Sequence, residues 1–401
     1  MADTETQSIY LDYAATTPFD RRVVEAMAPY MDAERELFGN PGSLHGYGQM
    51  ALAALDDARH RIARVLTAHH DEIVFTGSAT EANNLVLRGA VKAFVRDHPE
   101  NPVPRIIVSA IEHPSVLNTA RLMAHDGEVE LIILPVTPAG VVDVGVLEDV
   151  LNNRTALVSC MWVNNETGIA QPIDALINSV EAYRHKQSQN TWPLVHVDAV
   201  QAMGLWDINM ARTSVDFLTM SAHKLYGPKG VGAMYVRGGA MRGVCVPVLT
   251  GGDQEYGLRA GTENVAGSVG LATALELCGG ERVHEYDRLE KLSLDFFNQI
   301  HAAIPSSALN GDPSLRAPHI MNVYFPGCDR LWLSLDVARI AVSAGSACRQ
   351  RQAVPSHVLA AMGCDVQRIA QSTRFSFGRQ TTKAQIDEAV RRVIMIYKKT
   401  K

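Results

Sequence analysis

Between residues 70 and 236, short apolar runs rich in β-branched residues alternate with amphipathic stretches of helical periodicity. The runs are EIVFTG, RIIVSA, ELIILPV, TALVSCMWV, PLVHVDAV, VDFLTMSA and VGAMYV; helical stretches between them include TEANNLVLRGAVKAFV, SVLNTARLMA and IDALINSVEAYR. Nearly continuous Val/Ile/Leu strands separated by helices are typical of a mostly parallel sheet with helices on both faces. The sequence therefore predicts an α/β fold that binds its ligands at the carboxyl ends of the strands.

The pattern changes after about residue 264. Two helical stretches come first, VAGSVGLATALELC and EYDRLEKLSLDFFNQI, and the strand-like runs IMNVYF, IAVSAG and TRFSFG and the helical stretch KAQIDEAVRRVIMIY follow. A chain of 401 residues is long enough for more than one domain. We predict a large domain over residues 15–264 and a smaller α+β domain over residues 265–401, completed by residues 1–14.

Charge and composition exclude several classes of partner. The formal net charge is -6 and the isoelectric point is near 6.2, which gives no electrostatic reason to bind nucleic acid or an anionic membrane. The start, MADTETQSIYLDYA, is too polar and acidic for a secretory signal or transit peptide. No apolar run approaches the roughly 20 residues of a membrane span. We expect a soluble, cytoplasmic protein.

The cysteines show no pattern of a metal site or a disulfide scaffold. They are Cys160, Cys245, Cys278, Cys328, Cys348 and Cys364. None form a C-x-x-C pair, and none stand beside histidines at the spacing of zinc ligands. We therefore expect no bound metal, and most of these thiols should be small buried apolar groups.

Three features at predicted strand ends supply what pyridoxal 5'-phosphate (PLP) needs. Lys224, in MSAHKLYGPKG, can form a Schiff base. Asp198, at the end of PLVHVDAV, can bond a pyridinium nitrogen, although a helix cap is the ordinary reading of such a residue. In FTGSATEANN a strand turns into a helix at Ser78, Ala79 and Thr80, whose N–H groups can hold a phosphate. Such turns are common, so only the combination predicts PLP.

Other polar residues near strand ends suit the same site. His113, in SAIEHPSV, could stack on the ring and move protons, or simply meet water or backbone. Asn165 could offer its amide to the ring hydroxyl, or be a turn residue. Arg374, in STRFSFG, could hold a substrate α-carboxylate, or form a surface ion pair. Ser221 and His223 could donate to the phosphate or satisfy local backbone.

Ten motifs now stand in order along nearly the whole chain: YLDYAATTP, FGNPGSLHG, FTGSATEANN, EHPSV, VNNETG, HVDAVQ, SAHKLYGPKG, GLRAGTENV, SAGSAC and STRFSFGR. In these the sequence resembles the cysteine desulfurases of the class V aminotransferase family. The resemblance implies a two-domain fold type I PLP enzyme and a homodimer with active sites near the subunit interface. It also implies conversion of L-cysteine to L-alanine, with the sulfur held as a persulfide for an acceptor protein in iron–sulfur cluster assembly or tRNA thiolation.

The resemblance assigns roles position by position. Lys224 corresponds to the lysine that carries the cofactor, Asp198 to the partner of the ring nitrogen, and His113 to the ring-stacking histidine. Arg374 corresponds to the arginine of the substrate carboxylate, and Cys348 to the nucleophile. The ring-hydroxyl contacts fall on Gln201 and Asn165, the phosphate contacts on Thr80, Ser221 and His223, and the contact to the neighbouring subunit's cofactor on Thr262.

Two stretches depart from the family. Asp253 and Tyr256 stand where relatives usually have a glycine or histidine and an arginine, which bears on local phosphate or interface electrostatics. After Cys348, RQRQAV replaces the usual small, Ser-rich run, which bears on the choice of partner. Arg349 and Arg351 within it favour the thiolate form of Cys348.

Two alternatives to a cysteine desulfurase stay open. One is a selenocysteine lyase or cysteine sulfinate desulfinase, because the same cofactor chemistry serves these related substrates. The other is a sulfur-relay protein that is weakly active until a partner binds, which the arginines after Cys348 suggest.

Overall fold

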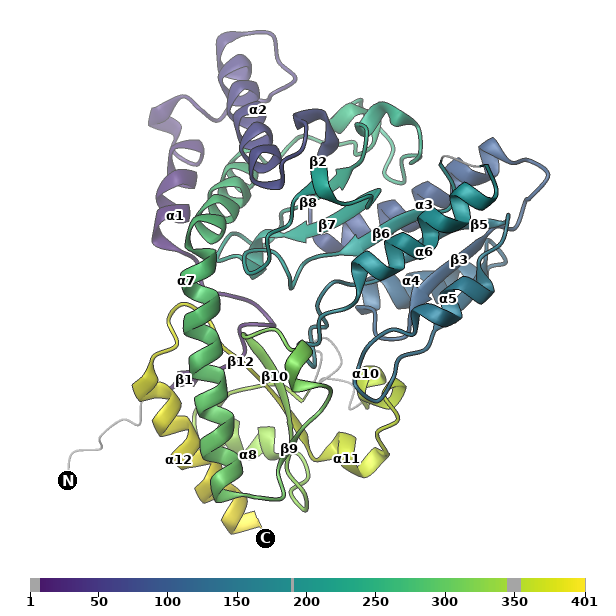
Figure 1. Ribbon diagram of the computed structural model, residues 1–401. Coiled ribbons are helices and arrows are strands. Elements are labelled where there is room, and N and C mark those ends of the chain that lie inside the picture. Colours follow the sequence, from purple (N-terminus) through teal and green to yellow (C-terminus); the bar gives the residue numbers. More distant parts are fainter. Residues whose placement is uncertain (1–7, 189–190, 345–354, 401) are drawn as a thin grey trace.

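The computed structural model describes residues 8–188, 191–344 and 355–400. Figure 1 shows two lobes, a larger one built around the main sheet and a smaller one that contains the C-terminal helix. In the described part of the chain, the main sheet has seven strands in the order β2-β8-β7-β6-β5-β3-β4. These strands are β2 (Ile73–Thr76), β3 (Arg105–Ser109), β4 (Glu130–Leu134), β5 (Thr155–Ser159), β6 (Leu194–Asp198), β7 (Phe217–Ser221) and β8 (Gly232–Val236).

The main sheet is mixed but mostly parallel. Strands β4, β3, β5, β6 and β7 run parallel to one another, whereas β8 is antiparallel to both β7 and β2. The predicted α/β fold, with a mostly parallel sheet flanked by helices, is therefore confirmed.

Side chains alternate between two apolar cores, one on each face of this sheet. In β2, Val74 packs into the core beneath α3 and α4, while Ile73 and Phe75 point into the core on the opposite face. The helices of the larger lobe are α1 (Arg21–Met27), α2 (Gly46–Leu66), α3 (Ala79–Asp97), α4 (Pro114–His125), α5 (Val144–Val150) and α6 (Ile173–Lys186). Helices thus cover both faces of the sheet, and the ends of the strands stay accessible to a ligand.

One long helix, α7 (Val265–Ala303), connects the lobes (Figure 1). The two separate helical stretches predicted here are wrong, because the helix continues through Gly279 and Gly280. Each glycine costs roughly 1 kcal/mol relative to alanine. Packing outweighs that cost: Leu271 lies in a core of the larger lobe, and Phe296 lies in the core of the smaller one.

The smaller lobe combines C-terminal strands with the N-terminal segment. Its sheet has the order β12-β10-β9, and β1 pairs in parallel with β11. Ile9 and Leu11 pack into the same core as Phe296 and Phe375. Its elements are β1 (Ile9–Tyr10), β9 (Ala308–Leu309), β10 (Ile320–Tyr324), α8 (Leu331–Val337), β11 (Ile340–Ala341), α10 (His357–Ala361), α11 (Val366–Ala370), β12 (Ser372–Ser376) and α12 (Lys383–Thr400). The predicted domain boundary itself stays a prediction.

Two remaining features concern membranes and thiols. Among the residues that the structure describes, no helix is long and apolar enough to cross a membrane. Five of the six cysteines fall within these residues and all five are free; four of them are buried, and Cys364 is half-buried. Most of these thiols therefore pack as small apolar groups, as predicted.

Candidate active site

A cavity of about 210 Å³ lies at the carboxyl ends of the central strands. Its walls come from the ends of β6 and β7, the N-termini of α3 and α4, the loop at Ala14 and Ala15, and strand β12. It brings together ten of the predicted residues: Ala79, Thr80, His113, Asn165, Asp198, Gln201, Ser221, His223, Lys224 and Arg374. Thr262 is exposed and does not line it, and Cys348 lies outside the described residues.

Lys224 ends the short 3-10 helix η5 (Ala222–Lys224), which directly follows β7. Its Nζ donates to the carbonyl oxygens of Ala14 (2.5 Å) and Ala15 (2.6 Å). The side-chain amide of Gln201 donates to the same Ala14 carbonyl (3.0 Å). The N-terminal loop therefore fixes the Lys224 amine at the cavity, which explains why this lysine is ordered at a turn.

Asp198 places a carboxylate at the end of β6, where it is 5% exposed. Its Oδ1 accepts from the Val200 backbone N–H (3.1 Å), and its Oδ2 accepts from Nδ2 of Asn83 (2.9 Å). A turn rather than an α-helix follows Asp198, so it is not a helix cap. Neutral donors thus hold this carboxylate, and it has no ion-pair partner within the described ranges.

Other residues that line the cavity carry hydrogen-bond donors. Ser78 caps α3 by accepting from the Glu81 N–H (3.2 Å), and Thr80 lies in the first turn of the helix beside Ala79. His223 contacts Thr16 Oγ1 through Nδ1 (3.2 Å). Burial, reinforced by nearby positive charges, lowers the pKa of His223 to about 4. Near neutral pH its ring is uncharged, so it can offer a phosphate an N–H but no positive charge.

Arg374 enters the cavity from β12 and is 1% exposed, so it is not a surface residue. One nitrogen, Nη2, pairs with Asp12 (2.7 Å), and Nη1 donates to the Asn165 carbonyl (2.8 Å). Its Nε is buried and has no hydrogen-bond partner in the described part of the chain. A buried guanidinium with an unused donor is suited to a carboxylate ligand.

Asn164, and not Asn165, is the residue whose side chain stabilises the turn. Asn164 is fully buried, and its side-chain oxygen accepts from the backbone N–H groups of Glu166 and Thr167, both at 2.9 Å. Asn165 lines the cavity instead.

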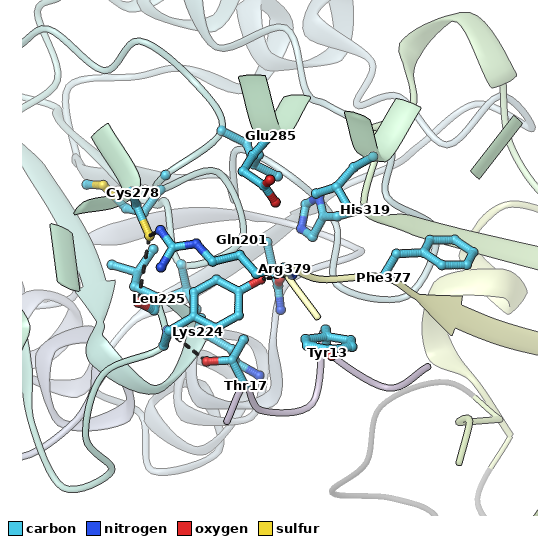
Figure 2. Close-up of a pocket in the computed structure, with 16 residues that line it drawn as sticks. Tyr13, Thr17, Gln201, Lys224, Leu225, Cys278, Glu285, His319, Phe377 and Arg379 are labelled. Atoms are coloured by element: carbon cyan, nitrogen blue, oxygen red, sulfur yellow. Dashed lines mark hydrogen bonds between the residues drawn. The ribbon is translucent and has the colours of Figure 1, made fainter. Parts of the chain in front are cut away.

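Lys224 also lines a smaller cavity, of about 50 Å³ (Figure 2). It shares Lys224 and Gln201 with the first cavity, and Tyr13 and His319 form part of its wall. Burial, followed by the charges of Arg316 and Lys224, lowers the pKa of His319 to about 3. Lys224 and an uncharged histidine therefore line the same small cavity.

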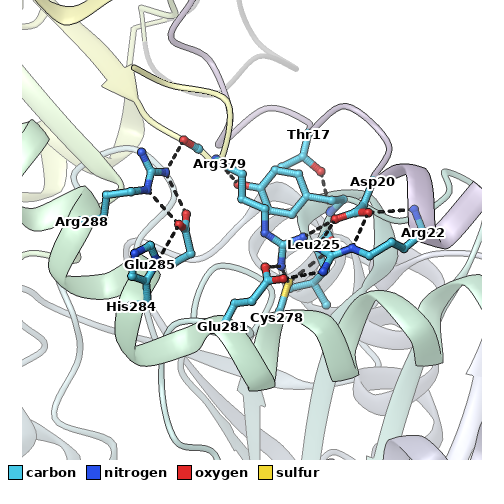
Figure 3. Close-up of polar contacts among 12 residues, drawn as sticks. Thr17, Asp20, Arg22, Leu225, Cys278, Glu281, His284, Glu285, Arg288 and Arg379 are labelled. Atoms are coloured by element: carbon cyan, nitrogen blue, oxygen red, sulfur yellow. Dashed lines mark hydrogen bonds and ion pairs between the residues drawn. The ribbon is translucent and has the colours of Figure 1, made fainter. Parts of the chain in front are cut away.

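Charged contacts beside this smaller cavity connect the two lobes (Figure 3). The guanidinium of Arg379 pairs with Asp20 (2.8 Å) and with Glu281 on α7 (2.9 Å), and it donates to the Cys278 sulfur (3.3 Å). The N-terminal segment, α7 and the loop after β12 therefore meet at one arginine, which holds the walls around Lys224 in place.

The family model "Aminotransferase class-V" matches residues 9–389. The chain belongs to the class V aminotransferase family. It is 39% identical over 383 residues to the cysteine desulfurase IscS of Dictyoglomus turgidum, covering 95% of this chain and 92% of the relative. It is 38% identical over 397 residues to the putative cysteine desulfurase IscS 1 of Bacillus subtilis, covering 98% and 99%.

Solved structures of this class V aminotransferase fold show the same architecture. A NifS-like protein superposes with a TM-score of 0.86 at 34% identity, covering 97% of this chain and 99% of that one. A structure described as SspA in complex with cysteine superposes with a TM-score of 0.78 at 33% identity, covering 92% and 99%. The fold is thus that of PLP-dependent fold type I enzymes, and the chain is an enzyme of this family.

The residues of the cavity fit PLP. The buried Asp198 carboxylate, held by neutral donors, suits a pyridinium nitrogen, a helix N-terminus suits a phosphate, and the Lys224 amine lines the same cavity. Three polar residues near the site received no role from the sequence, namely Asp12, Asn83 and Ser115. Each stands inside a motif that carried the resemblance (YLDYAATTP, FTGSATEANN or EHPSV), and this was the only signal that could have found them.

Proposed function

We propose that this protein is a cysteine desulfurase that converts L-cysteine to L-alanine and keeps the sulfur on Cys348 as a persulfide. The carbon–sulfur bond of the substrate breaks and a sulfur–sulfur bond forms, so L-cysteine and the Cys348 thiol give L-alanine and the persulfide. Atoms and electrons balance without an external oxidant. The observation that carries the proposal is one cavity that joins the Lys224 amine, the Asp198 carboxylate and the Arg374 guanidinium.

PLP, when bound here, supplies an electron sink that stabilises negative charge at the Cα of an amino acid. Asp198 would bond the ring nitrogen, and Gln201 and Asn165 the ring hydroxyl. The phosphate would be held by Ala79, Thr80, Ser221 and His223.

Arg374 would hold the α-carboxylate of cysteine, which orients the Cα–H and the thiol. The guanidinium would share its charge between that carboxylate and Asp12, with Nε as the unused donor. Lys224 would bind the cofactor and move the proton at Cα, while His113 faces the same cavity and would stack on the ring. A structural relative solved with cysteine supports this choice of substrate.

We further propose that the protein acts as a homodimer in the cytoplasm. Thr262 is exposed on its own subunit, as expected if it contacts the cofactor of the partner. Cys348 would then pass sulfur to an acceptor protein for iron–sulfur cluster assembly or tRNA thiolation.

The test measures alanine and persulfide together. Purified protein loaded with PLP is incubated with L-cysteine, selenocysteine or cysteine sulfinate, then alkylated, digested and searched by mass spectrometry. Cysteine should give alanine and a persulfide on Cys348, and Cys348→Ala should bind cysteine but form little of either product. Full activity of Cys348→Ala with cysteine, or alanine release from the other substrates alone, would overturn the proposal.

A further inference from the structure

A chain of hydrogen bonds runs beneath the cavity from Asp198 to His113. The Asn83 amide nitrogen donates to Oδ2 of Asp198 and to Oγ of Ser115, both at 2.9 Å. The Ser115 hydroxyl in turn contacts Nδ1 of His113 at 2.7 Å. Asn83 is fully buried and Ser115 is 7% exposed, so neither contact is weakened by solvent.

The groups at the two ends of this series of hydrogen bonds determine which atom donates in each bond. At one end, Oδ2 of Asp198 accepts from Nδ2 of Asn83, so the NH₂ group of Asn83 faces Asp198. At the other end, the backbone N–H of Ser115 donates to Nδ1 of His113 (3.1 Å), so that nitrogen carries no proton. Because Nδ1 carries no proton, the Ser115 hydroxyl, which accepts from Asn83, must be the donor in its contact with Nδ1.

The unused oxygen of Asn83 supports this direction. Its Oδ1 is buried and makes no hydrogen bond in the described part of the chain, which costs roughly 1–3 kcal/mol. Rotating the amide by 180° would instead place Oδ1 against the Asp198 carboxylate, where two acceptors repel. The amide therefore keeps this orientation because its nitrogen donates to both Asp198 and Ser115.

We propose that Asn83 and Ser115 are positioning residues that fix the carboxylate of Asp198 and hold His113 as the neutral tautomer protonated on Nε2. His113 then presents an N–H donor on the side of its ring away from Ser115, so it donates a hydrogen bond and does not remove the Cα proton. Lys224 is then the residue that removes the Cα proton. The consequence for catalysis rests on the proposed function, but the tautomer of His113 can be measured in the cofactor-free protein.

Four variants separate the links of the chain. Asn83→Leu removes both donors at similar volume, and Ser115→Ala removes only the link to His113. Ser115→Thr keeps a hydroxyl and should behave as the native protein. The matched control is Asn84→Ala, one residue further along α3, because the Asn84 amide donates to the Thr80 carbonyl instead.

Two measurements are made on the full-length protein. The first is the ¹⁵N chemical shift of His113 in histidine-labelled protein with and without PLP, assigned by its loss in His113→Gln. The second is the dissociation constant of PLP, from equilibrium dialysis. The native protein should show an unprotonated Nδ1 and a protonated Nε2.

The proposal predicts a distinct result for each variant. Asn83→Leu should give a mixture of tautomers and weaken PLP binding by on the order of 10-fold. Ser115→Ala should give the mixture with little loss of PLP affinity, and Asn84→Ala should change neither. If Asn83→Leu fails to fold, the Ser115→Ala and Ser115→Thr pair tests the same link.

A native His113 protonated on Nδ1, or a single unchanged tautomer in both Asn83→Leu and Ser115→Ala, would overturn the inference. A native protein that binds no PLP would instead overturn the proposed function, and the spectrum of the cofactor-free protein would still decide the tautomer.

Discussion

The cavity has a wall formed by the ends of the main-sheet strands and a wall formed by the smaller lobe, and the charged side chains of the two walls have different kinds of partner. The sheet wall carries Asp198 and Lys224 at strand ends, where amide N–H groups donate to the Asp198 carboxylate and the Lys224 amine donates to backbone carbonyl groups. The lobe wall, formed by Arg374, neutralises its charge with Asp12. The difference indicates that the sheet wall suits a resident cofactor, whose ring nitrogen Asp198 can bond, whereas Arg374 on the lobe wall can share its charge between Asp12 and the carboxylate of a substrate.

The largest expected effect is on the sheet wall. Lys224→Ala should lower alanine production from cysteine by about 10⁴-fold or more, because it removes both the covalent anchor and the proton carrier. The rate of alanine formation and the visible absorbance of the protein with PLP are the measurements. The neighbouring Lys229→Ala serves as a control with native rates. Turnover at the native rate in Lys224→Ala would contradict the role of this wall.

The buried ion pair between Arg59 and Glu255 lies away from the cavity and tests how much an ion pair contributes to the stability of this fold. Arg59 pairs with Glu255 (2.7 and 2.8 Å), and its guanidinium lies 5.1 Å from the centre of the Tyr256 ring. Arg59→Met should lower the free energy of unfolding by about 3–5 kcal/mol, because Glu255 is left buried without its partner. Urea denaturation measures this. A change near zero would show that the pair is dispensable.

Arg374→Lys tests the lobe wall. A lysine cannot reproduce the planar fork that orients a carboxylate, so kcat/KM for cysteine should fall by about 10²-fold while the dissociation constant of PLP stays unchanged. Arg368→Lys is the matched control, because Arg368 lies in the same lobe and contacts Asn310 and Tyr324. Loss of PLP with an unchanged KM would assign Arg374 to the cofactor instead.

Glu112 lies where the sheet wall meets the smaller lobe, since its backbone oxygen contacts Nε2 of His357 (2.9 Å). Burial raises the pKa of Glu112 to about 8, which is above its value in the unfolded chain. Its contribution to stability is therefore fully present below about pH 4.5 and is lost as the pH rises through 8. Glu112→Gln should remove this loss.

The free energies of unfolding of the native protein and of Glu112→Gln should be compared between pH 6.5 and 8. Burial lowers the pKa of His196 to about 4, so the contribution of that histidine is present above 6.5 and is lost only as the pH falls toward 4. Urea denaturation should show native stability falling by about 1 kcal/mol per pH unit across this window, and a flatter profile for Glu112→Gln. Equal slopes would mean that Glu112 is ionised in the folded state.

The sheet wall was more predictable from sequence than the lobe wall. Lys224, Asp198 and the turn into α3 follow predicted strands directly, so their place at the strand ends depends on local pattern alone. The pairing of Arg374 with Asp12 joins residues 362 positions apart, and no local pattern encodes it. The link from Asn83 through Ser115 to His113 depends likewise on how α3 packs beside α4. The continuity of α7 was missed because two glycines resemble a helix end until both cores are known.

The attachment point of the cofactor decides whether Lys224 holds PLP. Protein purified with PLP is reduced with borohydride and digested, and the peptides are searched by mass spectrometry for the added mass of the reduced cofactor. We expect that mass on the peptide that contains Lys224, with none on that peptide in Lys224→Ala. The added mass on Lys229 or on another lysine, or its absence from every peptide, would contradict the central claim that the sheet wall holds PLP through Lys224.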